Sequence, residues 1–286
     1  MANLKEIRNR ISSVSSTMQI TSAMKMVSAA KLKKAQDAIT AMRPYADKLN
    51  ELLQGLSSVM DEDNGSKFAE QREVNNVLIV AITSNRGLCG AFNSNIVKQV
   101  NHLINDTYAG KNISILTIGK KANDAFSKTK NIIANKSELF DDLTFENTAD
   151  IAHMLMNRFN EGQTDKIVLV YNSFKNAATQ IIKTEQFLPI VQVTKSDQLN
   201  FDYIFEPNKA DIVKTLIPKS LKTQLFKAVR DSFASEHGAR MTAMHKATDN
   251  ATDLRDQLKL TYNKARQAAI TNEILEIVGG AEALNN

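Results

Sequence analysis

Residues 219–286 read KSLKTQLFKAVRDSFASEHGARMTAMHKATDNATDLRDQLKLTYNKARQAAITNEILEIVGGAEALNN, with no proline and only Gly238, Gly279 and Gly280 as helix-weakening residues. At ~1.5 Å per residue, a continuous helix of this length would extend ~100 Å, several times the width of an ordinary domain. Apolar residues recur along it at steps of three and four, which keeps them on one face. They are Ala251, Leu254, Leu258, Tyr262, Ala265 and Ala269. The stretch therefore predicts a long helix whose apolar seam needs a partner.

The beginning of the chain carries a matching pattern. Its apolar residues also step by three and four, and they are Leu4, Ile7, Ile11, Val14 and Met18. No glycine occurs before Gly55, so we expect a first helix that runs to about Leu56, with a kink at Pro44. Pro218 suits the first turn of the second long helix. The two terminal helices are predicted to pair as an antiparallel coiled coil.

The two helices differ in length, and the difference leaves the C-terminal tip without a partner. If the first helix ends near Leu56, it falls roughly 15 to 20 residues short, or about 25 Å. The unmatched tip is nevertheless apolar around more than one face, a pattern typical of a helix that is buried on all sides. Its apolar residues are Ile270, Ile274, Leu275, Ile277, Val278, Ala281 and Leu284. We expect other chains to surround this tip.

The middle of the chain follows a different pattern, in which short apolar runs alternate with helical stretches. The runs that predict buried strands are residues 77–82, 113–118 and 166–171. The helical stretches begin near Phe92 and cover residues 120–127 and 148–160. Alternation of this kind implies a mostly parallel sheet. Residues 179–188 and 201–205 are expected to add later strands at an edge.

The chain therefore divides into four predicted parts. These are an N-terminal coiled-coil helix at residues 1–58, a linker at 59–75, an α/β domain at 76–207 and a C-terminal coiled-coil helix at 208–286. The predicted fold class is α/β, with a long antiparallel coiled coil of the terminal helices and a Rossmann-like α/β domain with a mostly parallel sheet.

Composition agrees with helix-rich packing, because 43% of the residues are hydrophobic, only 6% are aromatic and tryptophan is absent. No apolar run approaches the ~20 residues of a membrane span, and the first residues enter the amphipathic pattern directly. We therefore expect a chain that begins in its working compartment without a targeting segment. A single cysteine, Cys89, excludes an intrachain disulfide and suits a reducing compartment.

The net charge of +5 is unevenly distributed. Residues 1–43 hold eight lysines and arginines against Glu6 and Asp37, which gives this segment a net charge of +6. A basic helix is either a solvated face or a surface for an acidic partner, such as nucleic acid, anionic lipid or an acidic protein loop. Nucleic acid is the weaker choice, because no aromatic residues are interleaved and no known binding module is present.

Motifs that would carry chemistry are missing. Residues 86–90 form a glycine-bearing turn after a predicted strand, but they lack the spacings of a phosphate loop and of a dinucleotide-binding loop. The histidines show no metal-ligand spacing, and Cys89 has no identifiable base beside it. We therefore expect no catalytic, cofactor-binding or metal-binding residues. Two hypotheses remain, a mechanical and binding component or an enzyme that dimerises through its helices.

Three blocks of sequence resemble the gamma subunit of rotary ATP synthases, in the order of that family. They are IRNRI, TSAMKMV and AAKL at residues 7–11, 21–27 and 29–32; TSNRGLCG at 83–90; and SEHGARMTAM, ATDNA and YNKARQAAIT at 235–244, 247–251 and 262–271. The departures are small: Gln19 stands where the family usually has lysine, Asn85 where it usually has aspartate, and Ala91 where a further glycine is common.

The resemblance implies a non-catalytic central rotor shaft. Such a shaft couples ion-driven rotation of the membrane ring to conformational change in the catalytic subunits, and so to ATP synthesis or hydrolysis. The implied partners are the alpha and beta subunits of the hexameric head, the epsilon subunit and the c-ring. Neither a cofactor nor nucleic acid is implied, and the membrane is met only through the ring. The implied location is peripheral, at the cytoplasmic face of the bacterial inner membrane.

The resemblance also implies contact residues, carried over position by position. Facing the catalytic subunits are Arg240, Arg266, Gln267 and Thr271, with Met24 and Lys25 facing their acidic loop. Tyr203 and Glu206 match the foot surface over the membrane ring. The unmatched apolar tip, with Ile274, Ile277, Val278 and Leu284, is expected to lie in a sleeve formed by the hexamer.

Overall fold

A computed structural model describes residues 4–57, 66–190 and 209–285. The chain forms two compact units. The coiled-coil unit consists of Met1–Ser28 and Met241–Asn286, and the α/β unit consists of Ala29–Arg240. Two long helices, α1 at Leu4–Ser57 and α5 at Lys209–Asn285, contribute to both units. Each unit is described by itself.

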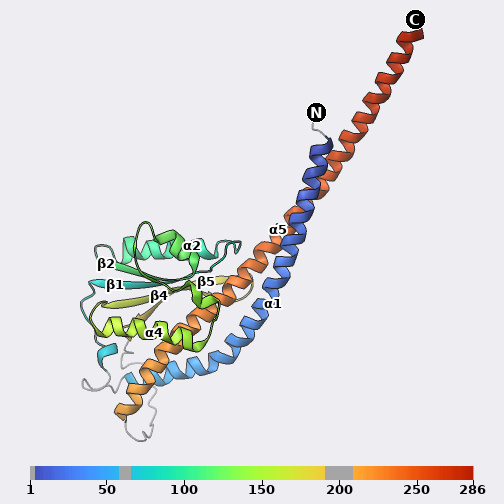
Figure 1. Ribbon diagram of the computed structural model, residues 1–286. Coiled ribbons are helices and arrows are strands. Elements are labelled where there is room, and N and C mark those ends of the chain that lie inside the picture. The colour runs from blue at the N-terminus through green and yellow to red at the C-terminus, as the bar shows by residue number, and fades with distance from the viewer. Residues whose placement is uncertain (1–3, 58–65, 191–208, 286) are drawn as a thin grey trace. The chain divides into compact units, whose positions relative to one another are not determined.

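A five-stranded sheet forms the centre of the α/β unit (Figure 1). Its strands are β1 at Asn76–Ile82, β2 at Asn112–Ile118, β3 at Asn131–Asn135, β4 at Lys166–Phe174 and β5 at Gln180–Leu188. The order across the sheet is β3-β2-β1-β4-β5, and only β5 runs antiparallel to its neighbour. Strand β1 lies in the middle, paired through Val77 with Ile113 on one side and with Lys166 on the other. The predicted, mostly parallel sheet is confirmed.

Helices cover both faces of this sheet (Figure 1). They are α2 at Phe92–His102, α3 at Lys120–Phe126, α4 at Phe145–Asn160 and the first part of α5. Strand residues alternate between the two faces, so Leu78 and Val80 pack with α4 and α5, whereas Val77 and Ile79 pack with α2 and α3. Because both faces are buried, β1 is a continuous apolar run. Thr144 begins α4 as an N-cap that accepts from the backbone N–H of Asn147 at 3.2 Å.

Short helical turns complete the α/β unit. A π-helical turn at Leu103–Thr107 follows α2 directly, and 3-10 turns occupy Ser66–Phe68 and Ser137–Phe140. The predicted strand at residues 201–205 and residues 59–65 of the predicted linker lie outside the described residues. Strand β5 is an edge strand, as expected from residues 179–188.

The expected position of Pro218 at the start of a helix is wrong. Helix α5 begins earlier, at Lys209, and Pro218 lies inside it. An internal proline costs a helix about 3 kcal/mol. The residues around it offset this cost, because Ile217 and Leu221 are buried in the core against the sheet. Pro44 likewise lies inside α1, which continues to Ser57, close to the predicted end at Leu56.

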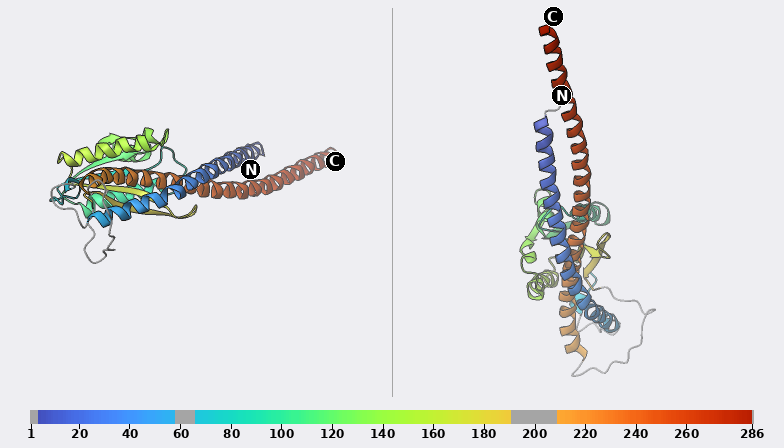
Figure 2. Two further views of the ribbon diagram at one scale, coloured as in Figure 1. Left: turned by 90° about the horizontal axis from the view of Figure 1, so that it is seen from below. Right: turned by 90° about the vertical axis from the view of Figure 1, so that its right-hand side faces the viewer.

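In the coiled-coil unit, α1 and α5 run side by side in opposite directions (Figure 2). The Thr248 hydroxyl donates to the Thr21 hydroxyl at 2.8 Å, and Arg8 Nη2 donates to the Tyr262 hydroxyl at 2.7 Å. Going along α5 from Thr248 to Tyr262, the partner residue on α1 moves back from Thr21 to Arg8, so the two helices are antiparallel. Ile7 is buried in the seam, as its spacing predicts.

One predicted seam residue is wrong. Leu254 is 47% exposed, whereas the next residue, Arg255, is only partly exposed and places Nη1 3.5 Å from the Met18 sulfur. From Ala251 the less exposed positions continue by a step of four to Arg255 and then of three to Leu258, which brings the aliphatic stem of Arg255 over α1. Its Nε donates to Asp256 at 2.9 Å, so the charged head keeps a partner at the surface.

Candidate partner-binding surfaces

The exposed end of α5 is the most distinctive surface of the coiled-coil unit. The N-terminal helix ends short of it (Figure 1), and every side chain described at residues 271–282 is exposed. The large apolar side chains there include Ile274, Ile277 and Val278, which are 55%, 72% and 55% exposed. In water, this much apolar surface on one short segment is typical of an interaction site. Nothing is described of the Leu284 side chain.

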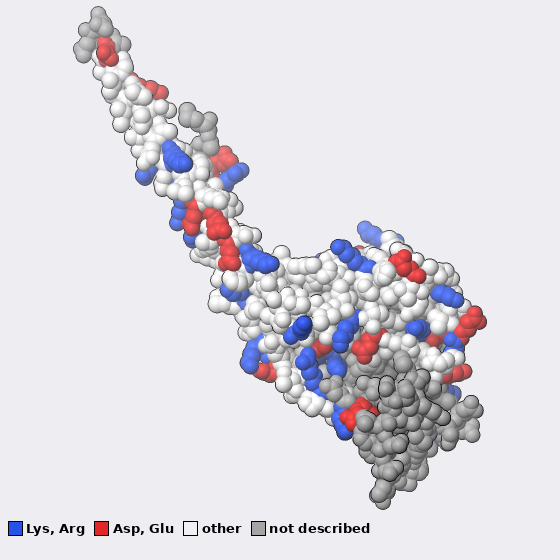
Figure 3. All heavy atoms as spheres, turned by 180° about the vertical axis from the view of Figure 1, so that it is seen from behind, with Lys and Arg blue, Asp and Glu red and all other residues white. Residues whose placement is uncertain are grey.

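Just before the tip, α5 carries a polar group of exposed side chains. Arg266, Gln267 and Thr271 are all exposed, and the Thr271 hydroxyl donates to the Gln267 carbonyl at 3.0 Å. On the face seen in Figure 3, uncharged atoms dominate the last turns of the helix, with a few acidic side chains. The polar group is therefore accessible for hydrogen bonds to another chain.

Near the expected contact residues Met24 and Lys25, α1 exposes three apolar side chains that the sequence reasoning missed. Met24 and Lys25 are themselves half-buried. Ile20, Met26 and Val27 are more than half exposed, although they lie beside the seam in sequence. The signal was available, because these residues fall between the three-and-four steps of the seam and so face away from α5.

In the α/β unit, the loop that joins β1 to α2 is fixed by its own hydrogen bonds. The Ser84 hydroxyl donates to the Arg86 carbonyl at 2.6 Å, and the Ser84 N–H donates to Asn93 Oδ1 at 3.0 Å. Asn85 links two further segments, accepting from the Lys120 N–H at 3.0 Å and donating to the Ser137 carbonyl at 2.9 Å. The loop therefore has the tight-turn structure expected of residues 86–90.

Arg240 does not lie on an open surface of the α/β unit. It is 7% exposed, and Nη1 lies 2.6 Å from Glu236 Oε1, while Nη2 donates to the carbonyls of Arg86 and Gly87 at 3.3 and 3.2 Å. Glu236 is equally buried, and burial raises the pKa of its carboxyl, an effect that Arg240 counteracts. Arg240 is thus buried within the α/β unit, whereas Arg266, Gln267 and Thr271 are exposed.

His237 is buried beside this pair. Its ring packs edge-on against Phe233 with centroids 4.5 Å apart, and neither ring nitrogen has a hydrogen-bond partner among the described residues. Burial, together with the nearby cations of Arg240 and Lys31, lowers the pKa of His237 from 6.5 to about 4. The ring is therefore neutral in the folded chain at neutral pH.

The depressed pKa predicts an acid-sensitive contribution to stability. The unfolded chain takes up a proton at His237 as the pH falls through 6.5, but the folded chain does so only near pH 4, so stability is lost across this window. The His237→Phe variant lacks this titration. Urea denaturation gives the free energy of unfolding of each protein at each pH. We expect the value for the variant minus that for the wild type to rise by about 2 kcal/mol when the pH falls from 7 to 4.5.

The control is Met241→Leu on the same helix, which removes no titratable group and is expected to keep the wild-type pH profile. The raised pKa values of Glu236 and Asp231 act in the opposite direction on acidification, but they are common to all the variants compared. An unchanged difference between wild type and His237→Phe at the two pH values would contradict the prediction.

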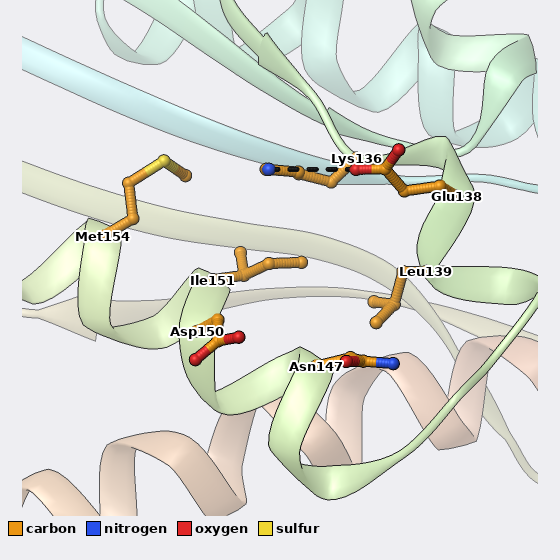
Figure 4. Close-up of a pocket in the computed structure, with 7 residues that line it drawn as sticks. All are labelled: Lys136, Glu138, Leu139, Asn147, Asp150, Ile151 and Met154. Carbon is orange, nitrogen blue, oxygen red and sulfur yellow. Dashed lines mark ion pairs between the residues drawn. The ribbon is translucent and has the colours of Figure 1, made fainter.

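A pocket of about 340 Å³ lies between the turn after β3 and helix α4 (Figure 4). It is lined by Lys136, Glu138, Leu139, Asn147, Asp150, Ile151 and Met154. Lys136 Nζ and Glu138 Oε1 lie 3.9 Å apart, and Leu139, Ile151 and Met154 contribute the apolar part of the lining. The lining holds no serine, threonine or cysteine side chain that could act as a nucleophile beside a base.

In the part of the chain that the structure describes, no group of three or more histidine, cysteine or carboxylate side chains could hold a metal ion. None of the described helices combines the length and apolar character needed to cross a membrane. The expected contact residues Tyr203 and Glu206 lie outside the described residues.

Comparisons with known proteins identify the family. A family model described as ATP synthase matches residues 3–284. The ATP synthase gamma chains of Flavobacterium psychrophilum and Christiangramia forsetii are 72% and 69% identical to this chain; the match covers 99% of both chains in the first case and 100% of both in the second.

Solved structures agree in fold. The central stalk and c-ring structure of the Tetrahymena thermophila mitochondrial ATP synthase contains a chain with a TM-score of 0.61 and 27% identity, matched over 80% of this chain and 99% of that one. A chain in the Euglena gracilis mitochondrial enzyme has a TM-score of 0.68 and 22% identity, over 98% and 94%. The sequence matches along nearly the whole length, supported by this likeness of fold, show that the chain belongs to the ATP synthase gamma chain family.

Proposed function

We propose that this chain transmits rotation through three surfaces: the apolar tip of α5, the polar group before it, and the foot formed by the α/β unit. A gamma chain is the central rotor stalk of an F-type ATP synthase and is not itself catalytic. It couples rotation of the membrane ring to conformational change in the catalytic subunits, and so to ATP synthesis or hydrolysis. The three surfaces say how this particular sequence would perform that role.

The observation that carries the proposal is the exposure of the tip. Burying one large aliphatic side chain contributes about 1.5 to 3 kcal/mol. A partner that covers the exposed side chains of Ile274, Ile277 and Val278 would therefore gain several kcal/mol of binding free energy. A sleeve formed by the alpha and beta subunits of the head would cover these side chains on all sides. We assign Leu284 to the same contact from its place in the sequence.

The polar group is proposed to form hydrogen bonds with the catalytic subunits. Arg266, Gln267 and Thr271 are exposed together, and hydrogen bonds to charged groups contribute more than neutral ones, about 1.5 to 3 kcal/mol each. Met24 and Lys25 are proposed to meet an acidic loop of the same subunits. Arg240 remains a proposed contact as well, but a partner carboxylate would have to compete with Glu236 for its guanidinium.

The foot is proposed to rest, with the epsilon subunit, on the membrane c-ring. Tyr203 and Glu206 are the proposed ring contacts, on the strength of their place in the family pattern. This arrangement would hold the chain as a peripheral subunit at the cytoplasmic face of the bacterial inner membrane. It would touch the membrane only through the ring, and it involves no nucleic acid.

Assembly with separately purified head subunits tests the proposal. The chain is expected to join alpha and beta subunits from the same organism into an assembly whose ATP hydrolysis drives rotation of a bead attached to the foot. The isolated chain is expected to show no saturable Mg-ATP binding in calorimetry, because residues 86–90 lack the spacing of a phosphate loop. Micromolar binding with turnover by the isolated chain, or a homodimer that excludes the head subunits, would overturn the proposal.

A further inference from the structure

A short segment of α5, from Glu236 to Arg240, contacts two separate loops of the α/β unit. Arg240 donates to the Arg86 and Gly87 carbonyls of the loop between β1 and α2, and Ala239 packs with Cys89 and Phe92 of the same loop and its helix. All of these groups belong to the α/β unit.

The second loop is the turn between β4 and β5, which approaches the same segment at Gly238. A Cβ atom added at Gly238 would lie 3.2 Å from Ala177 Cα and 3.3 Å from its carbonyl oxygen. At these distances the turn would have to shift by a few tenths of an ångström, so the absence of a Cβ at Gly238 allows its close approach. Because the two loops meet neighbouring residues of α5, this part of the helix is held from two directions.

In the contact with the first loop, the buried charge of Arg240 is both paired and hydrogen-bonded. Arg240 and Glu236 are each 7% exposed, and a buried charge is tolerated only when it is paired and hydrogen-bonded. Glu236 neutralises the guanidinium at 2.6 Å, which leaves Nη2 to bind the two carbonyls. The planar fork of arginine fixes the direction of these bonds, which a lysine ammonium on a flexible stem would not do.

The loop between β1 and α2 already holds the Arg86 carbonyl through a hydrogen bond of its own. The Ser84 hydroxyl already donates to the Arg86 carbonyl, which therefore accepts a second bond from Arg240. Leu88 has a backbone φ of 62°, in the left-handed region that a leucine rarely adopts. Strain of this kind persists only where surrounding contacts hold the backbone in place, and Arg240 supplies two of them.

We propose that Glu236 and Arg240 are positioning residues that fix the rotation of α5 about its own axis against the α/β unit. A helix that passes over a sheet on apolar contacts alone can slip about its axis, because those contacts have no direction. The buried ion pair and its two directed hydrogen bonds oppose that slip at the last residues of the α/β unit, in addition to the polar contacts that Gln224, Arg230 and Asp231 make earlier on the helix. Torque applied to the α/β unit then passes into the helix at this joint.

This proposal rests on the rotor function and assigns the pair a role inside the chain. The competing role for Arg240, a direct contact with a catalytic subunit, leads to different results in the experiment below. The variant is Arg240→Lys, which keeps the charge beside Glu236 but loses the fork that spans both carbonyls. Its matched control is Arg230→Lys on the same helix, because Arg230 donates to the Leu143 carbonyl at 3.0 Å and does not contact the β1–α2 loop.

Two measurements are made on each variant. The first is amide hydrogen exchange of residues 84–90 in the isolated full chain, which is expected to quicken by about tenfold in Arg240→Lys and to stay unchanged in Arg230→Lys. The second is the stall torque of the assembled rotor, which is expected to fall about twofold in Arg240→Lys and to stay unchanged in Arg230→Lys.

The outcomes separate the alternatives. Faster exchange with unchanged torque would show that the pair only stabilises the loop, and would overturn the proposal. Reduced torque with unchanged exchange would show that Arg240 acts through a partner subunit, and would overturn it as well. Failure of the wild-type chain to assemble or rotate would instead refute the rotor function itself.

Discussion

The Gly119→Ala variant is expected to lose more than about 3 kcal/mol of the free energy of unfolding. Gly119 joins β2 to α3 with a backbone φ of 114°, a conformation that side chains with a Cβ rarely adopt. An added Cβ would also lie 2.2 Å from the Thr83 carbonyl oxygen and 2.6 Å from its carbonyl carbon. The backbone has to move to relieve an overlap this close.

The surroundings of Gly119 leave little room for that movement. The Thr83 N–H donates to the Ile118 carbonyl at 2.8 Å, and the buried Thr83 hydroxyl accepts from the Ala122 N–H at 2.9 Å. Shifting Thr83 would therefore disturb the end of β1, and shifting Gly119 would disturb the start of α3. Breaking a buried hydrogen bond adds about 1 to 3 kcal/mol to the strain of the left-handed backbone.

Chemical denaturation of the full chain measures the loss. The matched control is Gly162→Ala, at a glycine with a φ of 71° but no atom within 4 Å of an added Cβ. That variant is expected to lose only about 1 kcal/mol, from the backbone conformation alone. Equal losses in the two variants would show that the close approach to Thr83 is relaxed at no cost, and would contradict the prediction.

Sequence periodicity predicted most of the fold, because the apolar residues of each element report which of its faces is buried. The unbroken apolar run of β1 and the three-and-four steps of the terminal helices led directly to a parallel sheet and a coiled coil. Strand β3 was missed. It has only five residues, with asparagine at both ends, and its pairing with β2 contains an irregularity between Ile115 and Leu116. Such a strand forms through its neighbour rather than through its own pattern.

The surfaces were only partly predictable. Exposure of the tip followed from counting residues on the two helices, and the structure agrees at Ile277 and Val278. Burial of Arg240 depends on carbonyl groups of Arg86 and Gly87, which are far away in sequence, and no local pattern reports such a contact. A similar cause explains why Arg255, and not the predicted Leu254, lies in the seam. It depends on where Met18 of the other helix lies.

Deleting residues 277–286 is expected to leave the stability of the free chain nearly unchanged and to impair the assembled motor. In the free chain, Ile277 and Val278 are 72% and 55% exposed, so their removal takes away little buried surface. The free chain is expected to become more soluble, because an exposed apolar patch is lost. Thermal unfolding of the truncated chain and the full chain gives this comparison.

In the assembled complex, the same deletion removes the side chains that we propose to lie in the sleeve. Loss of Ile277 and Val278 from a fully buried environment corresponds to about 3 to 6 kcal/mol of lost burial. Assembly yield and stall torque are therefore expected to fall. The polar group at Arg266, Gln267 and Thr271 is retained, so some rotation is expected to persist at reduced torque.

A point variant distinguishes the tip from exposed apolar surface in general. Ile277→Gln removes an aliphatic side chain at the tip, and Leu260→Gln removes one of similar exposure, 64%, lower on the same helix. Both should be nearly neutral in the free chain, because surface changes cost little stability. Only Ile277→Gln should weaken assembly if the sleeve covers the tip. A large loss of stability in the free truncated chain, with normal torque in the complex, would mean that the helix end packs against its own chain.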